Sequence, residues 1–123
     1  MRVFSTRRGD IWMTDLGEDG IGSEQKGLRP CVVIQNNIGN HYGPTVIVAA
    51  ITTAVKAKMP THFVLKSSDG VYKTSVCLCE QVFTVDKRRL KSYVGRLGED
   101  KFKVLNKCLS VSLGLTKGYD KIK

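Results

Sequence analysis

Long apolar runs are missing from this chain of 123 residues, and aromatic side chains make up only 7% of it. No apolar stretch approaches the roughly 20 residues that a membrane-spanning helix needs. The first residues lead into polar sequence and not into the apolar core of a signal peptide. We therefore expect no membrane span and a cytoplasmic protein.

The usual patterns of a metal site are also missing. There are four cysteines, and only Cys77 and Cys79 lie close in sequence, with a single residue between them. Zinc ligands usually stand two to four residues apart in a pair that is repeated elsewhere. Alternation along a strand would point both side chains to the same face, and we expect all four cysteines to be buried, reduced thiols. The sequence predicts no metal site and no cofactor.

A protein nucleophile with its base is equally hard to find. The chain has two histidines, His41 in a glycine-rich turn and His62 beside a predicted strand. Either could act as a general base, but a histidine in such a position usually has no catalytic role. No Ser-His-Asp order and no phosphate-binding glycine loop stands out. A conventional hydrolase site is therefore not indicated.

Positive charge is what the chain has in excess. It carries 20 Lys and Arg against 11 Asp and Glu, a net charge of +9, and 8 of the basic residues fall between positions 86 and 107. Such an excess favours a polyanionic partner through phosphate contacts and counterion release. A basic soluble protein without such a partner is the alternative that charge alone leaves open.

The apolar pattern predicts several short strands and one helix. Strands are expected at residues 9–16, 31–35, 45–51, 61–65, 75–82 and 93–97. Between them we expect a long mobile loop over 17–27, turns at 36–44 and 67–70, and one helical turn at 86–90. Phe102, Leu105, Cys108 and Leu109 repeat at helical spacing, and Gly114 offers a stop. The prediction is a single domain over residues 1–123, mainly β with a C-terminal helix, folded as a small, partly closed barrel.

Two residues at predicted strand ends suit one kind of chemistry. RNA supplies its own nucleophile, the 2′-hydroxyl, so a protein that cuts it must move protons and stabilise charge on phosphorus. Arg29 precedes Pro30 at the entry to one apolar strand, and Thr52 ends another. A guanidinium can bind phosphate oxygens bidentately, and a hydroxyl can donate beside it. Spacing alone leaves the ordinary interpretations open, a salt-bridged arginine and a threonine that satisfies backbone groups.

Several strings in the sequence resemble the MazF/PemK family of toxins. They are RGDIW (8–12), GSEQKGLRP (22–30), VVIQNN (32–37), PTVIVAAIT (44–52), KMPTHF (58–63), EQ (80–81) and SLGL (112–115). They follow the family's order and cover residues 8–115, the expected core of the domain. Residues 116–123 lie outside the resemblance, and we expect a disordered basic tail there.

The resemblance implies a small SH3-like, CcdB-like (PemK) barrel that forms a homodimer. It implies a metal-independent endoribonuclease that cuts single-stranded RNA, mRNA above all, at short sequences and leaves 2′,3′-cyclic phosphate and 5′-hydroxyl ends. The family's catalytic arginine and threonine fall on Arg29 and Thr52. Its RNA contacts fall on Ser23, Glu24, Gln25, Thr61, His62, Glu80 and Gln81. The usual partner is a MazE-like antitoxin whose acidic C-terminal segment occupies the RNA groove.

Departures from the family pattern concern the loop before Arg29. Residues 17–21 are rich in glycine and acidic side chains where relatives often carry proline and apolar residues, and Lys26 replaces a frequent glycine. These changes affect the loop geometry and the RNA sequence preference that the resemblance implies. Members of the family often cut within short motifs that contain ACA, and a similar site is expected here. Two other functions are weighed beside the ribonuclease: a gyrase-poisoning, CcdB-like toxin on the same fold, and a noncatalytic nucleic-acid-binding module.

Overall fold

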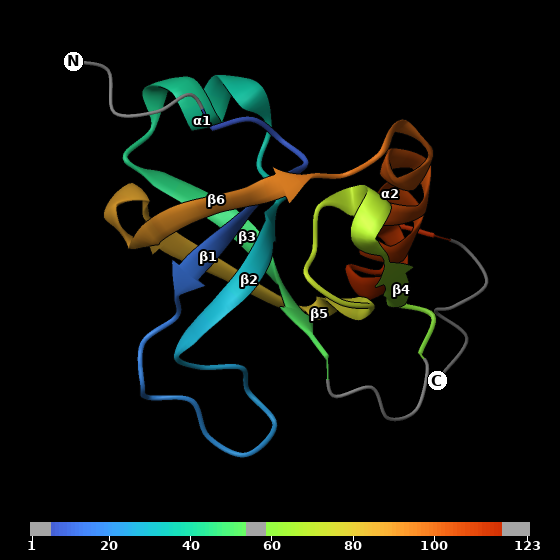
Figure 1. Ribbon diagram of the computed structural model, residues 1–123, viewed down its shortest axis with the longest axis horizontal. Coiled ribbons are helices and arrows are strands. Elements are labelled where there is room, and N and C mark those ends of the chain that lie inside the picture. Colours follow the sequence, from blue (N-terminus) through green and yellow to red (C-terminus); the bar gives the residue numbers. More distant parts are fainter. Residues whose placement is uncertain (1–5, 54–58, 117–123) are drawn as a thin grey trace.

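The computed structural model describes residues 6–53 and 59–116, and its main feature is a six-stranded antiparallel sheet (Figure 1). The strands are β1 (Asp10–Asp15), β2 (Leu28–Val33), β3 (Thr45–Thr52), β4 (His62–Leu65), β5 (Ser75–Asp86) and β6 (Leu90–Arg96), in the sheet order β4-β5-β3-β2-β1-β6. The helices are α1 (Asn37–Tyr42) and α2 (Glu99–Ser112), and the 3-10 turns are η1 (Ser67–Asp69) and η2 (Lys87–Arg89). The predicted mainly β fold with a C-terminal helix is confirmed, while the predicted tail falls almost wholly outside the described residues.

The sheet bends strongly without closing into a barrel. β4 and β6 are its two edge strands, and among residues 6–53 and 59–116 they do not pair with each other. The edges approach through the turn after η1, where Gly70 lies against Gly95 of β6. A Cβ built on Gly95 would stand 2.8 Å from the Gly70 Cα, so both positions require glycine for this close approach. The prediction of a partly closed barrel agrees with this arrangement.

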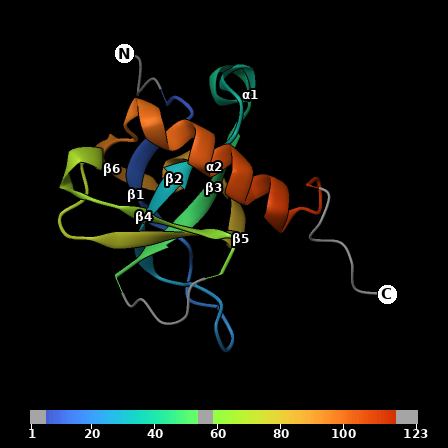
Figure 2. The same ribbon diagram turned by 90° about the vertical axis from the view of Figure 1, so that its right-hand side faces the viewer.

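Alternating side chains divide the sheet into two buried faces. One face packs under α2, which runs across the strands in Figure 2. Its core contains Val32, Ala49 and Ile51 together with Leu105 and Cys108 of the helix. The other face gathers a second core, which includes Trp12, Cys31, Val33, Val48 and Ala50. All four cysteines are buried and free, as predicted, and Cys77 and Cys79 do share the face under α2.

The sequence prediction was wrong in several places. Residues 36–44 are not a turn throughout, because they contain α1, whose first turn is capped by the Asn36 side chain accepting from Gly39 N at 2.8 Å. β2 begins at Leu28 and β6 at Leu90, each three residues before its predicted start.

β5 does not end at Val82 but continues to Asp86, because these residues pair with the first half of β3. The strand contains a bulge: β3 pairs Ala49 with Val82 but Ala50 with Leu78, so the three residues between them have no Cα partner in β3.

The RGD string at residues 8–10 holds the strands and α2 together. Gly9 has φ +96°, and a Cβ there would stand 2.3 Å from Cζ of Phe102, so the ring packs directly on the glycine backbone. Asp10 is buried and accepts from Arg96 Nη1 at 2.9 Å. These contacts join β1, β6 and α2, and they give the string a structural role.

No helix within residues 6–53 and 59–116 is long and apolar enough to cross a membrane.

Candidate functional site

Arg29 and Thr52 lie at the same end of the sheet, on adjacent strands. β2 and β3 are antiparallel, with Cys31 opposite Ala50. The pairing of β2 with β3 ends at these two residues, and Arg29 and Thr52 each lie two residues further toward the same end of the sheet. Alternation along the strands assigns both side chains to the face of Cys31 and Ala50, away from α2. In Figure 1 the start of β2 and the end of β3 both lie beside the loop that joins β1 to β2.

The two side chains have different surroundings. Arg29 is exposed, and its Nε donates to the carbonyl oxygen of Lys26 at 2.9 Å, which fixes the guanidinium against the loop. Thr52 is only 9% exposed and pairs with Val76 of β5 in the sheet. This end of the sheet therefore carries an accessible cation and a hydroxyl on a residue that the sheet holds in place.

A second group forms around Glu80, which lies in the bulge of β5. Thr61 Oγ1 donates to Glu80 Oε1 at 2.7 Å, and His62 Nε2 lies 2.9 Å from Glu80 Oε2. Partial burial raises the pKa of the Glu80 carboxyl, but the hydrogen bonds from Thr61 and His62 outweigh this, and the net pKa lies below its usual value. Glu80 is thus held as an anion that orients the two neighbouring side chains.

The sheet register places His62 on the same face as Thr52. His62 is opposite Leu78 in β5, and Leu78 is opposite Ala50 in β3, two residues before Thr52. Residues directly opposite in a sheet share a face, so Ala50, Thr52 and His62 all face away from α2. The face therefore carries Arg29, Thr52 and the Glu80 group on four adjacent strands.

Gln81 holds the β1–β2 loop against β5. Its Oε1 accepts from Gln25 N at 3.3 Å, and its Nε2 donates to the Ser23 carbonyl oxygen at 3.1 Å. Glu24, between them, turns back into the loop and accepts from Ile21 N at 2.8 Å. The loop that was expected to be mobile is therefore bonded both within itself and to the sheet.

The structure thus brings together the residues that the sequence suggested, in linked groups. Ser23 and Gln25 join Gln81, Thr61 and His62 join Glu80, and Arg29 lies at the same sheet end as Thr52. His41 is elsewhere, on α1, with its ring at 90° to that of Tyr42. No pattern in the sequence indicates the bulge, which depends on contacts between strands, or the Lys26 carbonyl that anchors Arg29, which depends on the loop's conformation.

Removing the Gln81 side chain is expected to loosen this loop. Two hydrogen bonds of about 0.5–1.5 kcal/mol each would be lost in Gln81→Ala, so the Gln25 amide should exchange with solvent roughly 5- to 100-fold faster. Hydrogen–deuterium exchange of the loop peptide measures this. Gln81→Glu keeps the acceptor for Gln25 N but loses the donor to Ser23, and should give an intermediate rate. Unchanged exchange in Gln81→Ala would show that the loop is held by other contacts.

These observations define a class of protein: a small, bent antiparallel sheet with one covering helix, which carries an exposed cation and a nearly buried hydroxyl at one end of the face away from that helix. Residues 7–113 match the family described as PemK-like, MazF-like toxin of type II toxin-antitoxin system. The chain belongs to this family.

Individual relatives agree with that assignment. The chain is 51% identical over 111 residues to Endoribonuclease MazF of Staphylococcus saprophyticus, covering 89% of this chain and 92% of the relative. An endoribonuclease solved in complex with its cognate antitoxin, from a mycobacterial species, has a TM-score of 0.77 at 25% identity, covering 90% of this chain and 97% of that one. MazF from Deinococcus radiodurans shares the fold, with a TM-score of 0.77 at 21% identity over 90% of this chain and 98% of that one.

Proposed function

We propose that this protein is a toxin endoribonuclease that cuts single-stranded RNA at short sequences without a metal ion. The observation that carries the proposal is that Arg29 and Thr52, on the adjacent strands β2 and β3, lie at the same end of the sheet, each two residues beyond the pair of Cys31 and Ala50. The family assignment and the 51% identity to an endoribonuclease support it.

The two side chains would supply the charge stabilisation that the chemistry requires. The 2′-hydroxyl next to the scissile phosphate attacks phosphorus and loses its proton, the bond from phosphorus to the 5′-oxygen of the following nucleotide breaks, and that oxygen gains a proton, so that one proton is lost and one is gained. Products would be a 2′,3′-cyclic phosphate and a 5′-hydroxyl. Arg29 would bind the phosphate oxygens as negative charge develops on them, and the Thr52 hydroxyl would donate a hydrogen bond to the same group.

The surrounding groups would bind the unstacked bases. Amide, hydroxyl and carboxylate groups can read the edges of bases in a single strand. Ser23, Glu24 and Gln25 on the loop, and Thr61, His62, Glu80 and Gln81 on β4 and β5, supply such groups. The contact of Gln81 with the loop means that its amide would have to exchange partners to reach a base.

The partners and location follow from the same proposal. An antitoxin with an acidic C-terminal segment would compete with RNA for the site around Arg29, as expected for a chain of net charge +9. The solved relative in complex with its cognate antitoxin supports this partner. We further propose that the protein acts as a homodimer in the cytoplasm, where its RNA substrate is found.

Cleavage of a long RNA in the presence of EDTA tests the proposed activity. Discrete fragments with cyclic phosphate ends are expected, and sequencing their 5′ ends would give the cut site. A requirement for magnesium, or intact RNA with folded protein, would contradict the mechanism. DNA breaks with stable messages in arrested cells would point instead to gyrase poisoning.

Replacing Thr52 by valine is expected to slow cleavage about 10- to 100-fold, because it removes a hydrogen-bond donor that stabilises the transition state and keeps the shape of the side chain. Single-turnover rates with excess enzyme measure the effect. Thr52→Ser restores the hydroxyl and should recover most of the rate. Equal rates for valine and threonine would remove the hydroxyl from the mechanism.

A further inference from the structure

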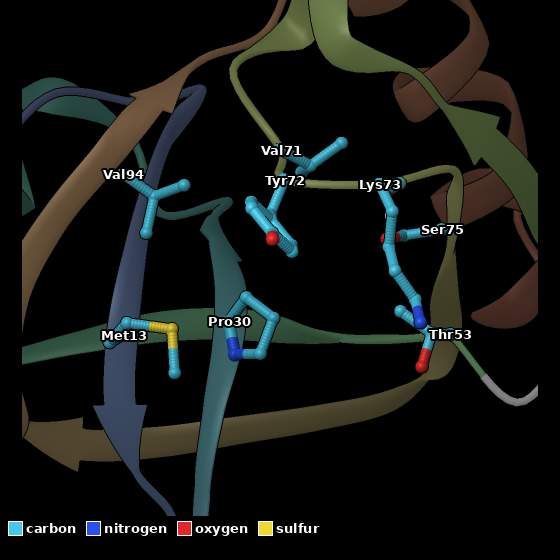
Figure 3. A pocket seen from close by; sticks show the side chains of 8 residues that line it. All are labelled: Met13, Pro30, Thr53, Val71, Tyr72, Lys73, Ser75 and Val94. Carbon is cyan, nitrogen blue, oxygen red and sulfur yellow. Dashed lines mark hydrogen bonds between the residues drawn. The ribbon is translucent and has the colours of Figure 1, made fainter.

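An open, apolar pocket of about 370 Å³ lies on the other side of the sheet end that carries Arg29 and Thr52 (Figure 3). Met13 of β1, Pro30 of β2 and Val94 of β6 form one side, and Tyr72 of the loop before β5 faces them. The side chains of Lys73 and Thr53 lie at one edge, and together with Ser75 and the Tyr72 hydroxyl they supply polar atoms to the lining.

We propose that this pocket binds one unstacked base of the RNA strand, next to the scissile phosphate. The base would lie against the Tyr72 ring, and a neighbouring phosphate would pair with the Lys73 ammonium. This inference rests on the proposed function and adds a subsite to it.

Tyr72 is the first reason for choosing a base as the occupant. Its side chain is 98% exposed, which means that the ring adds almost nothing to the protein's own core. An exposed aromatic ring beside apolar walls offers a flat surface on which any base can stack. Lys73 is the one cation among the lining residues that the structure describes, and its ammonium suits the phosphate that accompanies each base. The net charge of +9 favours the same ligand.

The position of the pocket is the second reason. Pro30 and Thr53, which line it, directly follow Arg29 and Thr52 in the chain. Side chains alternate along strands, so Pro30 belongs to the face opposite Arg29 at the same end of β2. An RNA strand that passes over this end of the sheet can place its phosphate at Arg29 and an adjacent base in the pocket.

Paired changes in protein and RNA test the subsite. The probe is a short oligoribonucleotide that spans a mapped cut and carries a 2′-deoxy nucleotide at the scissile position, so that it binds without being cut. Tyr72→Ala is expected to weaken its binding roughly tenfold, while Tyr72→Phe should bind like the wild type. Oligonucleotides that each lack one base should identify a single position at which the missing base weakens binding to the wild-type protein about tenfold, as Tyr72→Ala does. The Tyr72→Ala variant should bind the oligonucleotide that lacks this base almost as well as the complete one, because the ring on which the base would stack is already missing.

Matched variants separate this subsite from general effects. Tyr42 on α1 is also exposed, at 80%, and Tyr42→Ala should leave binding unchanged. Lys73→Ala should weaken binding and reduce its salt dependence, whereas Lys91→Ala on β6 should do so less. Wild-type cleavage together with undiminished binding by Tyr72→Ala would overturn the subsite and leave the proposed function standing. If Tyr72→Ala weakened binding of an acidic peptide but not of RNA, the subsite would be overturned in favour of a protein ligand. If the wild-type protein neither bound nor cut RNA, both the subsite and the proposed function would be overturned.

Discussion

Arg29→Ala is expected to slow RNA cleavage by roughly 10²- to 10³-fold, the usual cost of removing one group that stabilises transition-state charge. The Arg29 side chain is exposed, and its Nε donates to the carbonyl oxygen of Lys26 in the loop. The fold of the protein should therefore tolerate the change. The loss should appear mainly in the single-turnover rate, because the guanidinium interacts most strongly when the phosphate gains charge.

Arg29→Lys is the matched control. It keeps the positive charge but loses the planar fork, and we expect a rate between those of alanine and arginine. Thermal unfolding should be nearly unchanged in both variants, which separates chemistry from folding. A wild-type rate in Arg29→Ala would remove this residue from the mechanism, and so would an equal fall in rate and stability.

Asp69→Ala is expected to lower the free energy of unfolding by about 3 kcal/mol, because it breaks a buried ion pair and leaves its partners unpaired. The Asp69 side chain is 2% exposed. It accepts from Lys66 N and Gly98 N, each at 3.0 Å, and from Lys101 Nζ at 3.1 Å. Lys101 also donates to the Val64 carbonyl oxygen at 3.2 Å, so one network joins β4, η1 and the start of α2. Urea denaturation of the two proteins measures the difference.

Lys101→Met is the comparison for this site. In Lys101→Met the Asp69 carboxylate keeps its hydrogen bonds from Lys66 N and Gly98 N. The Lys101 side chain is 20% exposed in the wild-type protein, so we expect a smaller loss of stability than in Asp69→Ala. If Asp69→Ala cost no more than Lys101→Met, the backbone hydrogen bonds would carry little of the stabilisation. A double variant, measured with both single ones, gives the coupling between the two charges.

The same carboxylate predicts a pH dependence of stability. Burial raises the pKa of Asp69, but hydrogen bonds from Lys66, Gly98 and Lys101 outweigh it, so the pKa in the folded protein lies below the ordinary value of 3.8. The unfolded chain therefore binds the proton more readily than the folded one. The stabilisation is fully present above about pH 4 and is lost as the pH falls through the folded pKa. Asp69→Asn should remove this part of the acid dependence, and an unchanged pH profile of stability would contradict the assignment.

Much of the secondary structure follows from local pattern. Alternation or a continuous apolar run marked each strand, and the spacing of Phe102, Leu105 and Leu109 marked α2. The errors lie where local pattern is weakest: the turn at 36–44 hides a short capped helix, and β2 and β6 begin before their apolar runs. β5 extends beyond Val82 because its last residues pair with the first half of β3, a contact between distant segments.

The sequence likewise predicted part of the candidate site, and the rest required the tertiary structure. Arg29 and Thr52 could be proposed from their places at strand ends, and the resemblance to the toxin family pointed to the same pair. Their common face required the pairing of β2 with β3, which no local pattern specifies. The subsite around Tyr72 could not be proposed from sequence, because its walls come from segments far apart in the chain.

What the sequence by itself determined is the excess of positive charge, the apolar pattern that marks the strands and α2, and the motifs that belong to the family. These are properties of the chain itself, and they are the same in any conformation. Only the tertiary structure decided that Gln81 holds a loop 58 residues away, that Asp69 pairs with Lys101 across 32 residues, and that Arg29 and Thr52 lie at the same end of the sheet. The physical reason is that a hydrogen bond or an ion pair depends on distance in space, and folding brings together groups whose separation along the chain gives no indication of it.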